Sequence, residues 1–273
     1  MIQTSDIEFL ISTMNRSDFD FLEKMFKYHN LSDLNILIIN QTTKDKILKT
    51  NRKNIRVVNV FEKGLSKSRN LAIKHAKAKI CFIADDDIEY LPNAIDTVIQ
   101  AYQDYPDATL ISFQFLRENN QPCKIYKSQS GYQNRLLHQQ SLSSIEISFN
   151  LKLVRNNDIA FNNLFGLWAR FVCAEESVFR DDIIRKHLKV VYIDKPIVKH
   201  YGKTTEPDEG SKAYTQALTA QKYLQHKNLI YLWLMRYIWL LLKRKVIKPS
   251  QISQIWNYGV TAVQDYKKLT SEQ

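Results

Sequence analysis

Three consecutive carboxylates, Asp85, Asp86 and Asp87, stand directly after a short apolar run and are the sharpest chemical feature of the sequence. Adjacent carboxylates repel one another unless water or a cation screens them, and Mg²⁺ and Mn²⁺ prefer oxygen ligands. These ions often share their coordination with substrate phosphates, so the pattern indicates a diphosphate site. An acidic turn that caps the following helix would carry the same three residues, and only the fold around them separates the two interpretations.

The segments around these aspartates alternate between strand and helix. Short apolar runs predict buried parallel strands, and apolar residues at helical spacing predict the helices between them. An open parallel α/β sheet holds its binding residues at the carboxyl ends of its strands, where the aspartates would lie. We expect strands at residues 7–13, 35–40, 55–60, 79–84, 109–116, 145–149 and 190–193, and helices that begin near Ser17, Gly64, Pro92 and Ser177.

Composition excludes several classes of protein. With 273 residues, 44% of them hydrophobic and 11% aromatic, the chain can build a sizeable core, which excludes a disordered or fibrous protein. Its three cysteines are far apart, which excludes a disulfide scaffold and zinc-finger spacing and suits a reducing compartment. The N-terminus lacks the basic start of a signal peptide, and no run of 18 apolar residues occurs, so we expect a cytoplasmic protein without a spanning helix.

Four short motifs follow one another along the chain. A strand leads into Asn15, a Gly-Leu-Ser-Lys-Ser-Arg-Asn run ends at Asn70, the three aspartates come next, and Glu175 and Glu176 precede a helix. In this order, over roughly residues 6–202, the motifs resemble those of family 2 glycosyltransferases of the GT-A fold. The resemblance implies a GT-A-like open, mostly parallel twisted sheet with flanking helices. It also implies transfer of a sugar from a nucleotide diphosphate to an acceptor hydroxyl, with inversion.

The resemblance further implies which residues bind the donor. Asn40 stands where the family usually has an acidic residue that recognises uracil. An amide can both donate and accept hydrogen bonds, so a pyrimidine remains possible at this position. A UDP-sugar is the favoured donor. Arg69 would approach the diphosphate region, while Lys67 has the plainer explanation of a solvated surface residue. The implied donor-binding residues are Thr13 and Asn15 in the first loop, Asn40, Arg69, Asp85 beside the ribose, and Asp86 in support.

The same resemblance assigns the metal and the chemistry. Asp87 would bind Mn²⁺ or Mg²⁺ directly and His200 would complete the coordination, although a lone histidine is more often structural. Glu176 would act as catalytic base, with Glu175 as the alternate, and both could equally cap the helix that follows. Trp168 would stack on the acceptor sugar, unless it is a core residue.

The C-terminal part of the chain is strongly basic. Of the net charge of +11, eight Lys and Arg residues lie between Ser211 and Gln264, where there is no Asp or Glu. We therefore divide the chain into a catalytic domain at 1–210 and a basic, apolar helical extension at 211–273. Residues 229–248 predict a helix that is apolar around most of its circumference and could dock on an anionic membrane surface. The alternative is that this helix completes the core.

These features together predict a metal-dependent inverting glycosyltransferase. The family and the tail suggest assembly of a surface or capsular polysaccharide on a lipid carrier, at the inner face of the cell membrane, with no nucleic-acid partner. A non-catalytic GT-A-like subunit that binds membrane is one alternative, and a metal-dependent nucleotidyltransferase, disfavoured by the lack of a Gly-rich phosphate loop near the N-terminus, is another.

Overall fold

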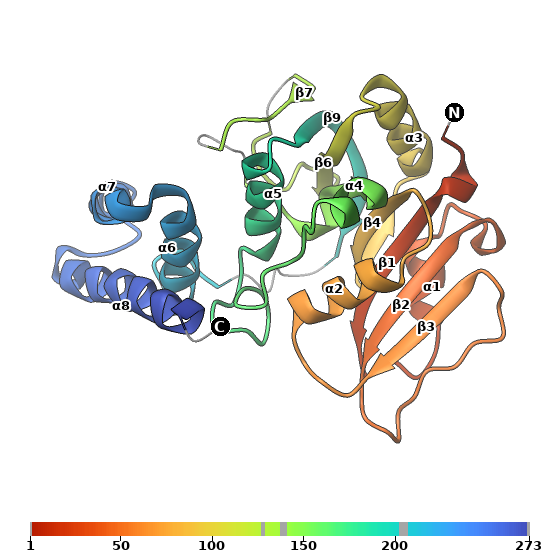
Figure 1. Ribbon diagram of the computed structural model, residues 1–273, viewed down its shortest axis with the longest axis horizontal. Coiled ribbons are helices and arrows are strands. Elements are labelled where there is room, and N and C mark those ends of the chain that lie inside the picture. Colours follow the sequence, from red (N-terminus) through yellow and green to blue (C-terminus); the bar gives the residue numbers. More distant parts are fainter. Residues whose placement is uncertain (1, 127–128, 137–140, 202–206, 272–273) are drawn as a thin grey trace.

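A mixed α/β sheet with helices on both faces forms the larger part of the molecule, and three C-terminal helices pack beside it (Figure 1). The structure, a computed structural model, describes residues 2–126, 129–136, 141–201 and 207–271. Its strands are β1 Ile7–Met14, β2 Asn35–Gln41, β3 Ile55–Val60, β4 Ile80–Asp85, β5 Ile88–Tyr90, β6 Ala108–Arg117, β7 Gly131–Tyr132, β8 Ile147–Asn150 and β9 Lys189–His200.

The sheet is mostly parallel, as the sequence predicted. Its order is β3-β2-β1-β4-β8-β6-β9-β5, with β7 paired to β9. The strands β3, β2, β1 and β4 run parallel, and so do β6 and β9. Antiparallel β8 joins these two groups, while β5 and β7 pair antiparallel with β9. The carboxyl ends of β1, β2 and β4 therefore meet at one edge, because Ser12 pairs with Asp85 and Met14 with Gln41.

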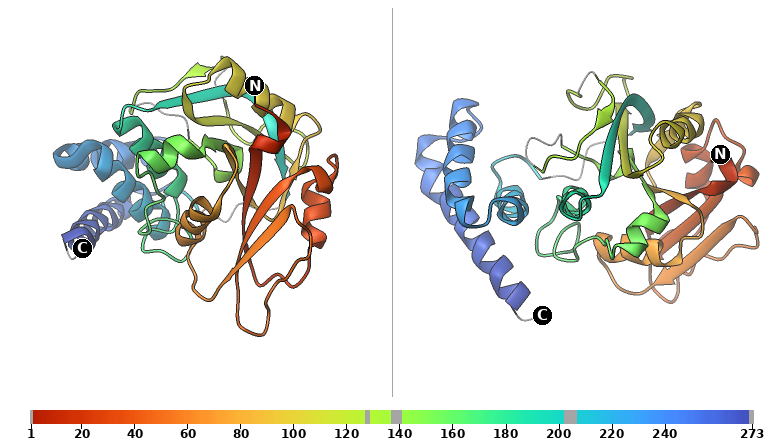
Figure 2. Two further views of the ribbon diagram at one scale, coloured as in Figure 1. Left: turned by 45° about the vertical axis from the view of Figure 1, so that its right-hand side comes forward. Right: turned by 45° about the horizontal axis from the view of Figure 1, so that its top comes forward.

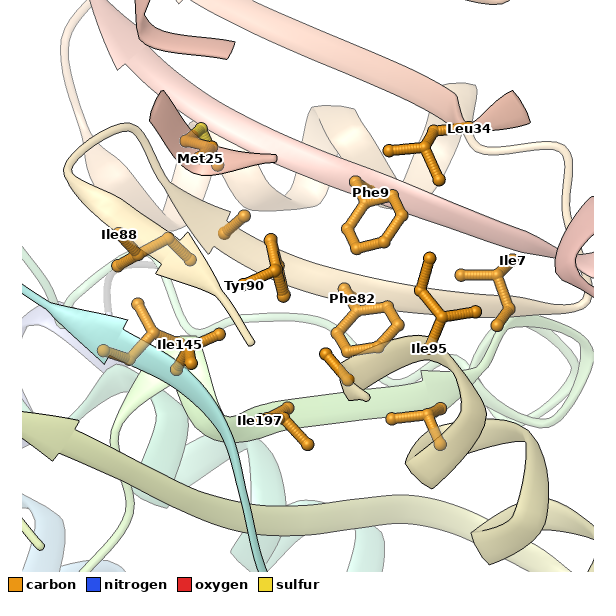
Figure 3. Close-up of a cluster of buried hydrophobic side chains, with 14 of the residues drawn as sticks. Ile7, Phe9, Met25, Leu34, Phe82, Ile88, Tyr90, Ile95, Ile145 and Ile197 are labelled. Atoms are coloured by element: carbon orange, nitrogen blue, oxygen red, sulfur yellow. The ribbon is translucent and has the colours of Figure 1, made fainter. Parts of the chain in front are cut away.

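Helices cover both faces of the sheet. Residues of α1 and α3 pack on one face, and residues of α2, α4 and α5 pack on the other. On the first face Phe9 and Phe82 stack with their ring centroids 4.8 Å apart, and the edge of Tyr90 packs on both rings (Figure 3). The helices are α1 Asp20–Met25, α2 Leu65–His75, α3 Ala94–Asp104, α4 Leu151–Asn156, α5 Glu175–Arg185, α6 Lys212–His226, α7 Ile230–Lys243 and α8 Ile252–Ser271.

The C-terminal helices are joined to the rest of the chain by a shared core and by polar contacts. Phe165, Phe171 and Val178 pack with alanines of α6 and α8, and Asp181 of α5 accepts hydrogen bonds from two glutamines of α6. Within the extension, α8 approaches α7 at Gly259, where a Cβ would lie 2.5 Å from a methyl group of Leu234. Among the residues described, no helix is both long enough and apolar enough to cross a bilayer.

Several boundaries differ from the expectations, most of them by one or two residues. The first helix begins after Phe19 rather than at Ser17, and it is only six residues long. The last strand does not stop before Pro196 but continues to His200, where it pairs with β5 and β6. Proline lacks the N–H that a regular ladder needs, and the register of β6 against β9 shifts on both sides of the Gln114–Pro196 pair. Pro196 in the sequence predicts the end of a strand, but the irregular hydrogen-bond ladder accommodates it and the strand continues.

Candidate active site

A pocket of about 330 Å³ opens at the carboxyl ends of β1, β2 and β4. The first residues of α2 and α5 border it from one side, and His200 at the end of β9 borders it from another. The sequence-predicted residues that line it are Thr13, Arg69, Asp85, Asp86, Asp87, Trp168, Glu175, Glu176 and His200. One cavity therefore gathers all three aspartates, both glutamates and the histidine, from segments up to 115 residues apart.

Asp86 is held by the loop that follows β1. Its Oδ2 accepts hydrogen bonds from the hydroxyl of Thr13 and from Nε of Arg16, the latter at 2.7 Å. The ion pair raises the pKa of Arg16, chiefly through its hydrogen bond to the Asp86 carboxylate. Asn15 has φ 54°, which turns the chain sharply between Thr13 and Arg16. The middle aspartate is therefore engaged with protein groups, as a supporting residue would be.

Asp85 belongs to a second, deeper network that is centred on Arg69. Nη2 of Arg69 donates to Oδ1 of Asp85 at 3.2 Å, and Nη1 donates to Oε1 of Glu175 at 2.7 Å. Ser144 donates to the other oxygen of Asp85 at 3.2 Å. Burial by itself lowers the pKa of Arg69, but the charges of Asp85, Glu175 and Glu176 outweigh it and raise that pKa. A fully ionised guanidinium thus ties the strand β4 to the start of α5.

The two adjacent glutamates lie in different environments. The side chain of Glu175 is only 8% exposed and is paired with Arg69, whereas Glu176 is less buried and lines the same pocket. Ala174, which precedes them, has the left-handed φ of 76°. Gly166 has φ 99°, and a Cβ there would lie 3.3 Å from the carboxyl carbon of Glu175. The backbone on both sides is therefore shaped around the buried glutamate.

Asp87 and His200 meet across the mouth of the pocket. Nε2 of His200 lies 3.3 Å from Oδ2 of Asp87, and this hydrogen bond raises the pKa of His200 although burial opposes the shift. The short strand β5 brings them together, because its first residue, Ile88, pairs with His200. A carboxylate oxygen and an imidazole nitrogen that face one pocket fit a divalent cation whose other ligands are phosphate oxygens and water. Within the described ranges, no three His, Cys, Asp or Glu side chains are arranged to hold a metal on their own.

Asn40, expected at the nucleobase, lies behind the pocket wall. It is fully buried, its Oδ1 accepts from the Arg16 backbone N–H, and its Nδ2 donates to the Arg16 carbonyl and to Oδ1 of Asn59. These bonds hold the loop after β1. The next residue, Gln41, lines the pocket instead, and its buried Oε1 has no hydrogen-bond partner among the residues described. An orphaned acceptor costs about 1–3 kcal/mol unless a ligand supplies a donor.

The remaining candidates divide between the rim and the scaffold. Trp168 is 64% exposed at the rim, with the left-handed φ of 68°, and Nζ of Lys63 lies 4.4 Å from its ring centroid. It is not a core residue. Asn70 exchanges hydrogen bonds with the backbone of Phe161, and Lys67 pairs with Glu62 at the surface, so both contact protein rather than the pocket.

Comparisons with known proteins place the chain in a family. The sequence profile described as Glycosyl transferase family 2 matches residues 9–186. Residues 1–349 of S. aureus TarS have a similar structure, with a TM-score of 0.56 and 15% identity over 94% of this chain and 71% of that one. The same TarS fragment in complex with UDP-GlcNAc gives a TM-score of 0.61 and 13% identity, covering 95% and 80% of the two chains. No curated protein sequence matches the chain.

The fold is of the GT-A type that glycosyltransferases share. The chain belongs to glycosyltransferase family 2, because the family profile covers well over half of it. The resemblance indicated by the four motifs is thereby confirmed.

Proposed function

We propose that the protein transfers a sugar from a nucleoside-diphosphate sugar to an acceptor hydroxyl with inversion at the anomeric carbon. The observation that carries this proposal is the gathering of the three aspartates, His200 and Glu176 around one pocket. A nucleotide sugar is the natural donor for such a site, and the similar TarS structure contains UDP-GlcNAc. The acceptor would lie against Trp168, whose exposed ring can stack on a sugar.

The reaction would be a single displacement. Glu176 takes the proton of the acceptor hydroxyl as its oxygen bonds to the anomeric carbon, and the bond from that carbon to the diphosphate breaks on the opposite face. Asp85 and Asp86 are held in place by Arg69 and Arg16, so the donor meets a pre-arranged surface. Asp87 and His200 are the residues that would hold Mn²⁺ or Mg²⁺, which when bound neutralises charge on the departing nucleoside diphosphate.

The proposal is tested by incubating the protein with a panel of nucleotide sugars and measuring release of free nucleotide, with Mn²⁺ and with EDTA. We expect release that depends on both donor and metal and that rises when a saccharide acceptor is added. Nucleotide binding without turnover of any donor would instead support a non-catalytic subunit. Release of pyrophosphate from a nucleoside triphosphate would support a nucleotidyltransferase.

The metal assignment leads to a prediction for Asp87. In Asp87→Ala, removal of an exposed carboxylate relieves local repulsion and opens no cavity, so the fold should persist while transfer is lost. Calorimetric titration with the donor measures its affinity. Mn²⁺ should increase the donor affinity of the parent and leave that of the variant unchanged. Asp96→Ala, at an exposed position of α3, is the control and should behave like the parent. Equal Mn²⁺ dependence in the Asp87 variant would contradict the assignment.

We assign recognition of the nucleobase to Gln41 in place of Asn40. The amide of Gln41 carries an acceptor oxygen and an NH₂ group that donates, and its unpaired Oε1 can accept the N3–H of uracil while its nitrogen donates to a ring carbonyl. Cytosine presents the reverse pattern, which a rotated amide could also match. Uracil is the favoured base, because its N3–H can satisfy the orphaned oxygen and the similar TarS structure contains UDP-GlcNAc.

This assignment predicts the effect of Gln41→Glu. A carboxylate only accepts, so it should keep the N3–H bond of uracil but repel the ring N3 of cytosine, and the preference for UDP over CDP should widen by about tenfold. Titration of both nucleotides measures the ratio. In the matched variant Asn40→Asp, the new oxygen would face the Arg16 carbonyl and Asn59, so stability should fall with little change in the ratio. If the UDP to CDP ratio changes only in the Asn40 variant, recognition of the nucleobase belongs to Asn40 and not to Gln41.

We further propose that residues 1–210 form the catalytic domain and that residues 211–273 place it at the inner face of a membrane. The support is the charge of the extension, which has no acidic residue between Ser211 and Gln264. An acceptor carried on a lipid, as in assembly of a surface or capsular polysaccharide, would then be presented where the enzyme resides. Transfer to a lipid-linked saccharide in vesicles, compared with the same free saccharide, tests this location.

A further inference from the structure

Helix α7 has two apolar faces, and only one of them is covered. Leu234, Tyr237, Ile238 and Leu241 are buried against the other C-terminal segments. At roughly 100° per residue, the opposite face carries a stripe that is about half exposed to solvent. Its apolar members are Leu232, Met235 and Trp239, whose exposed fractions are 59%, 50% and 55%. The helix therefore completes the core and also presents large apolar side chains to the outside.

Positive charge lies along one edge of this exposed stripe. Arg236 and Lys243 are exposed beside it, and Nζ of Lys243 lies 5.2 Å from the ring centroid of Trp239. Lys245 and Lys248, also exposed, follow the end of the helix. Arg244 differs from these residues because it pairs with Glu209. We call the stripe and these four cations, Leu232, Met235, Trp239, Arg236, Lys243, Lys245 and Lys248, the α7 surface.

The α7 surface is separate from the active site. In two views, α7 lies at the end of the molecule farthest from strands β1 to β3 (Figure 2). None of its residues lines the pocket. A ligand bound there could therefore anchor the enzyme without obstructing the donor.

The charges argue for an anionic occupant. A symmetric pairing of two copies through this face would bring like charges from Arg236 and Lys243 of both chains together, at a cost. The segment offers no acidic residue to balance them, since none occurs between Ser211 and Gln264. A partner that complements the α7 surface needs an apolar interior to receive the stripe and negative charge at its boundary to attract the four cations. A bilayer with anionic headgroups has these two properties.

We propose that the α7 surface docks on an anionic lipid bilayer, with α7 lying in the plane of the interface. Leu232, Met235 and Trp239 enter the boundary between headgroups and acyl chains, where an indole ring is well accommodated. Arg236, Lys243, Lys245 and Lys248 contact the headgroups. The buried face of α7 stays on the protein, so the helix does not cross the membrane. The docking needs no nucleotide or acceptor, and it is independent of the proposed reaction.

Cosedimentation of the purified full chain with large vesicles tests the proposal. The vesicles contain phosphatidylcholine either alone or mixed with phosphatidylglycerol, and no donor is added. We expect pelleting with the anionic vesicles only, weakened by salt. Replacement of Arg236, Lys243, Lys245 and Lys248 by Gln should reduce the partition coefficient by about tenfold or more. Trp239→Ser should also reduce it, with an unchanged unfolding midpoint, because the ring is exposed.

A second set of four basic residues, all of them lysines, controls for net charge. Lys24, Lys53, Lys74 and Lys152 are exposed on the sheet part of the molecule, and changing them to Gln removes the same charge. This variant should pellet nearly as the parent does. The proposal is overturned if the parent fails to pellet, or if both charge variants lose binding equally. It is also overturned if the parent is a dimer in solution that Trp239→Ser dissociates, since a second copy would then cover the face.

Discussion

Replacing Glu176 by glutamine should reduce the rate of sugar transfer by about 10²–10⁴, because the amide keeps the shape of the side chain but cannot accept a proton. Donor binding should survive, since the proposed donor contacts are with the aspartates and not with Glu176. The unfolding midpoint should change less than it does in Glu175→Gln, because Glu176 is less buried than Glu175. Turnover, calorimetric donor titration and thermal unfolding measure the three quantities separately.

Glu175→Gln is the matched comparison, one residue away. Glu175 is buried and bonded to Nη1 of Arg69, so its loss should lower the free energy of unfolding by about 2 kcal/mol and affect turnover through the position of α5. The pH dependence of transfer separates the two roles. The loss of activity toward acid pH that reports a general base should vanish in Glu176→Gln and persist in Glu175→Gln. If Glu175→Gln is inactive and Glu176→Gln turns over fully, the roles are exchanged.

The strands were predictable because of where they lie. The inner parallel strands have helices on both faces and are buried along almost their whole length, so β2 and β4 are nearly unbroken apolar runs and β1 departs from one first at Glu8. The edge strand β3 is only partly buried, but its residues are still mostly apolar. Strand β5 gives no such signal, since it is three residues long and directly follows the aspartates. Its pairing with β9 nevertheless brings His200 to Asp87. The sequence could suggest both residues by resemblance, but not the element that brings them together.

The residue at the end of β2 that lines the pocket is Gln41 and not Asn40, for a geometric reason. Side chains alternate across a strand, so neighbours at its end point to opposite faces. The apolar run predicts a strand that ends at Asn40, but β2 continues to Gln41. Asn40 consequently points into hydrogen bonds with Arg16 and Asn59, and Gln41 reaches the pocket. The alternation of residues 36–41 was the signal that could have identified Gln41, since it places the two polar side chains on different faces.

Two further features depend on contacts between distant residues. Arg69 and Glu175 are 106 positions apart, and no spacing rule relates them, so the ion pair between them could not be foreseen. The apolar helix at 229–248 left two interpretations open, because leucines and aromatics occupy both of its faces. Packing on α8 assigns one face to the core and leaves the other exposed.

Removing the guanidinium of Arg69 should have the largest effect on stability of any single change in the site. Its side chain is 1% exposed and pairs with Glu175 and Asp85, so Arg69→Met leaves one buried carboxylate and one partly buried carboxylate without their cation. Breaking a buried pair from one side typically costs 3–5 kcal/mol, and we expect about that loss in the free energy of unfolding. Urea denaturation measures it. Transfer should fall as well, since Asp85 and the start of α5 lose their common anchor.

Two variants on the same helix make this prediction specific. Lys67→Met removes a charge two residues earlier, where the side chain is half exposed and pairs with Glu62 at the surface, so it should cost less than about 1 kcal/mol. Arg69→Lys keeps the charge, but a single ammonium cannot reproduce the two-pronged contact, so an intermediate loss is expected. Adding Glu175→Gln to Arg69→Met should recover part of the loss, because it removes the buried charge that the methionine leaves unpaired. If Arg69→Met cannot be isolated, Arg69→Lys alone still carries the test. Equal stabilities of Arg69→Lys and the parent would show that the network does not depend on the guanidinium.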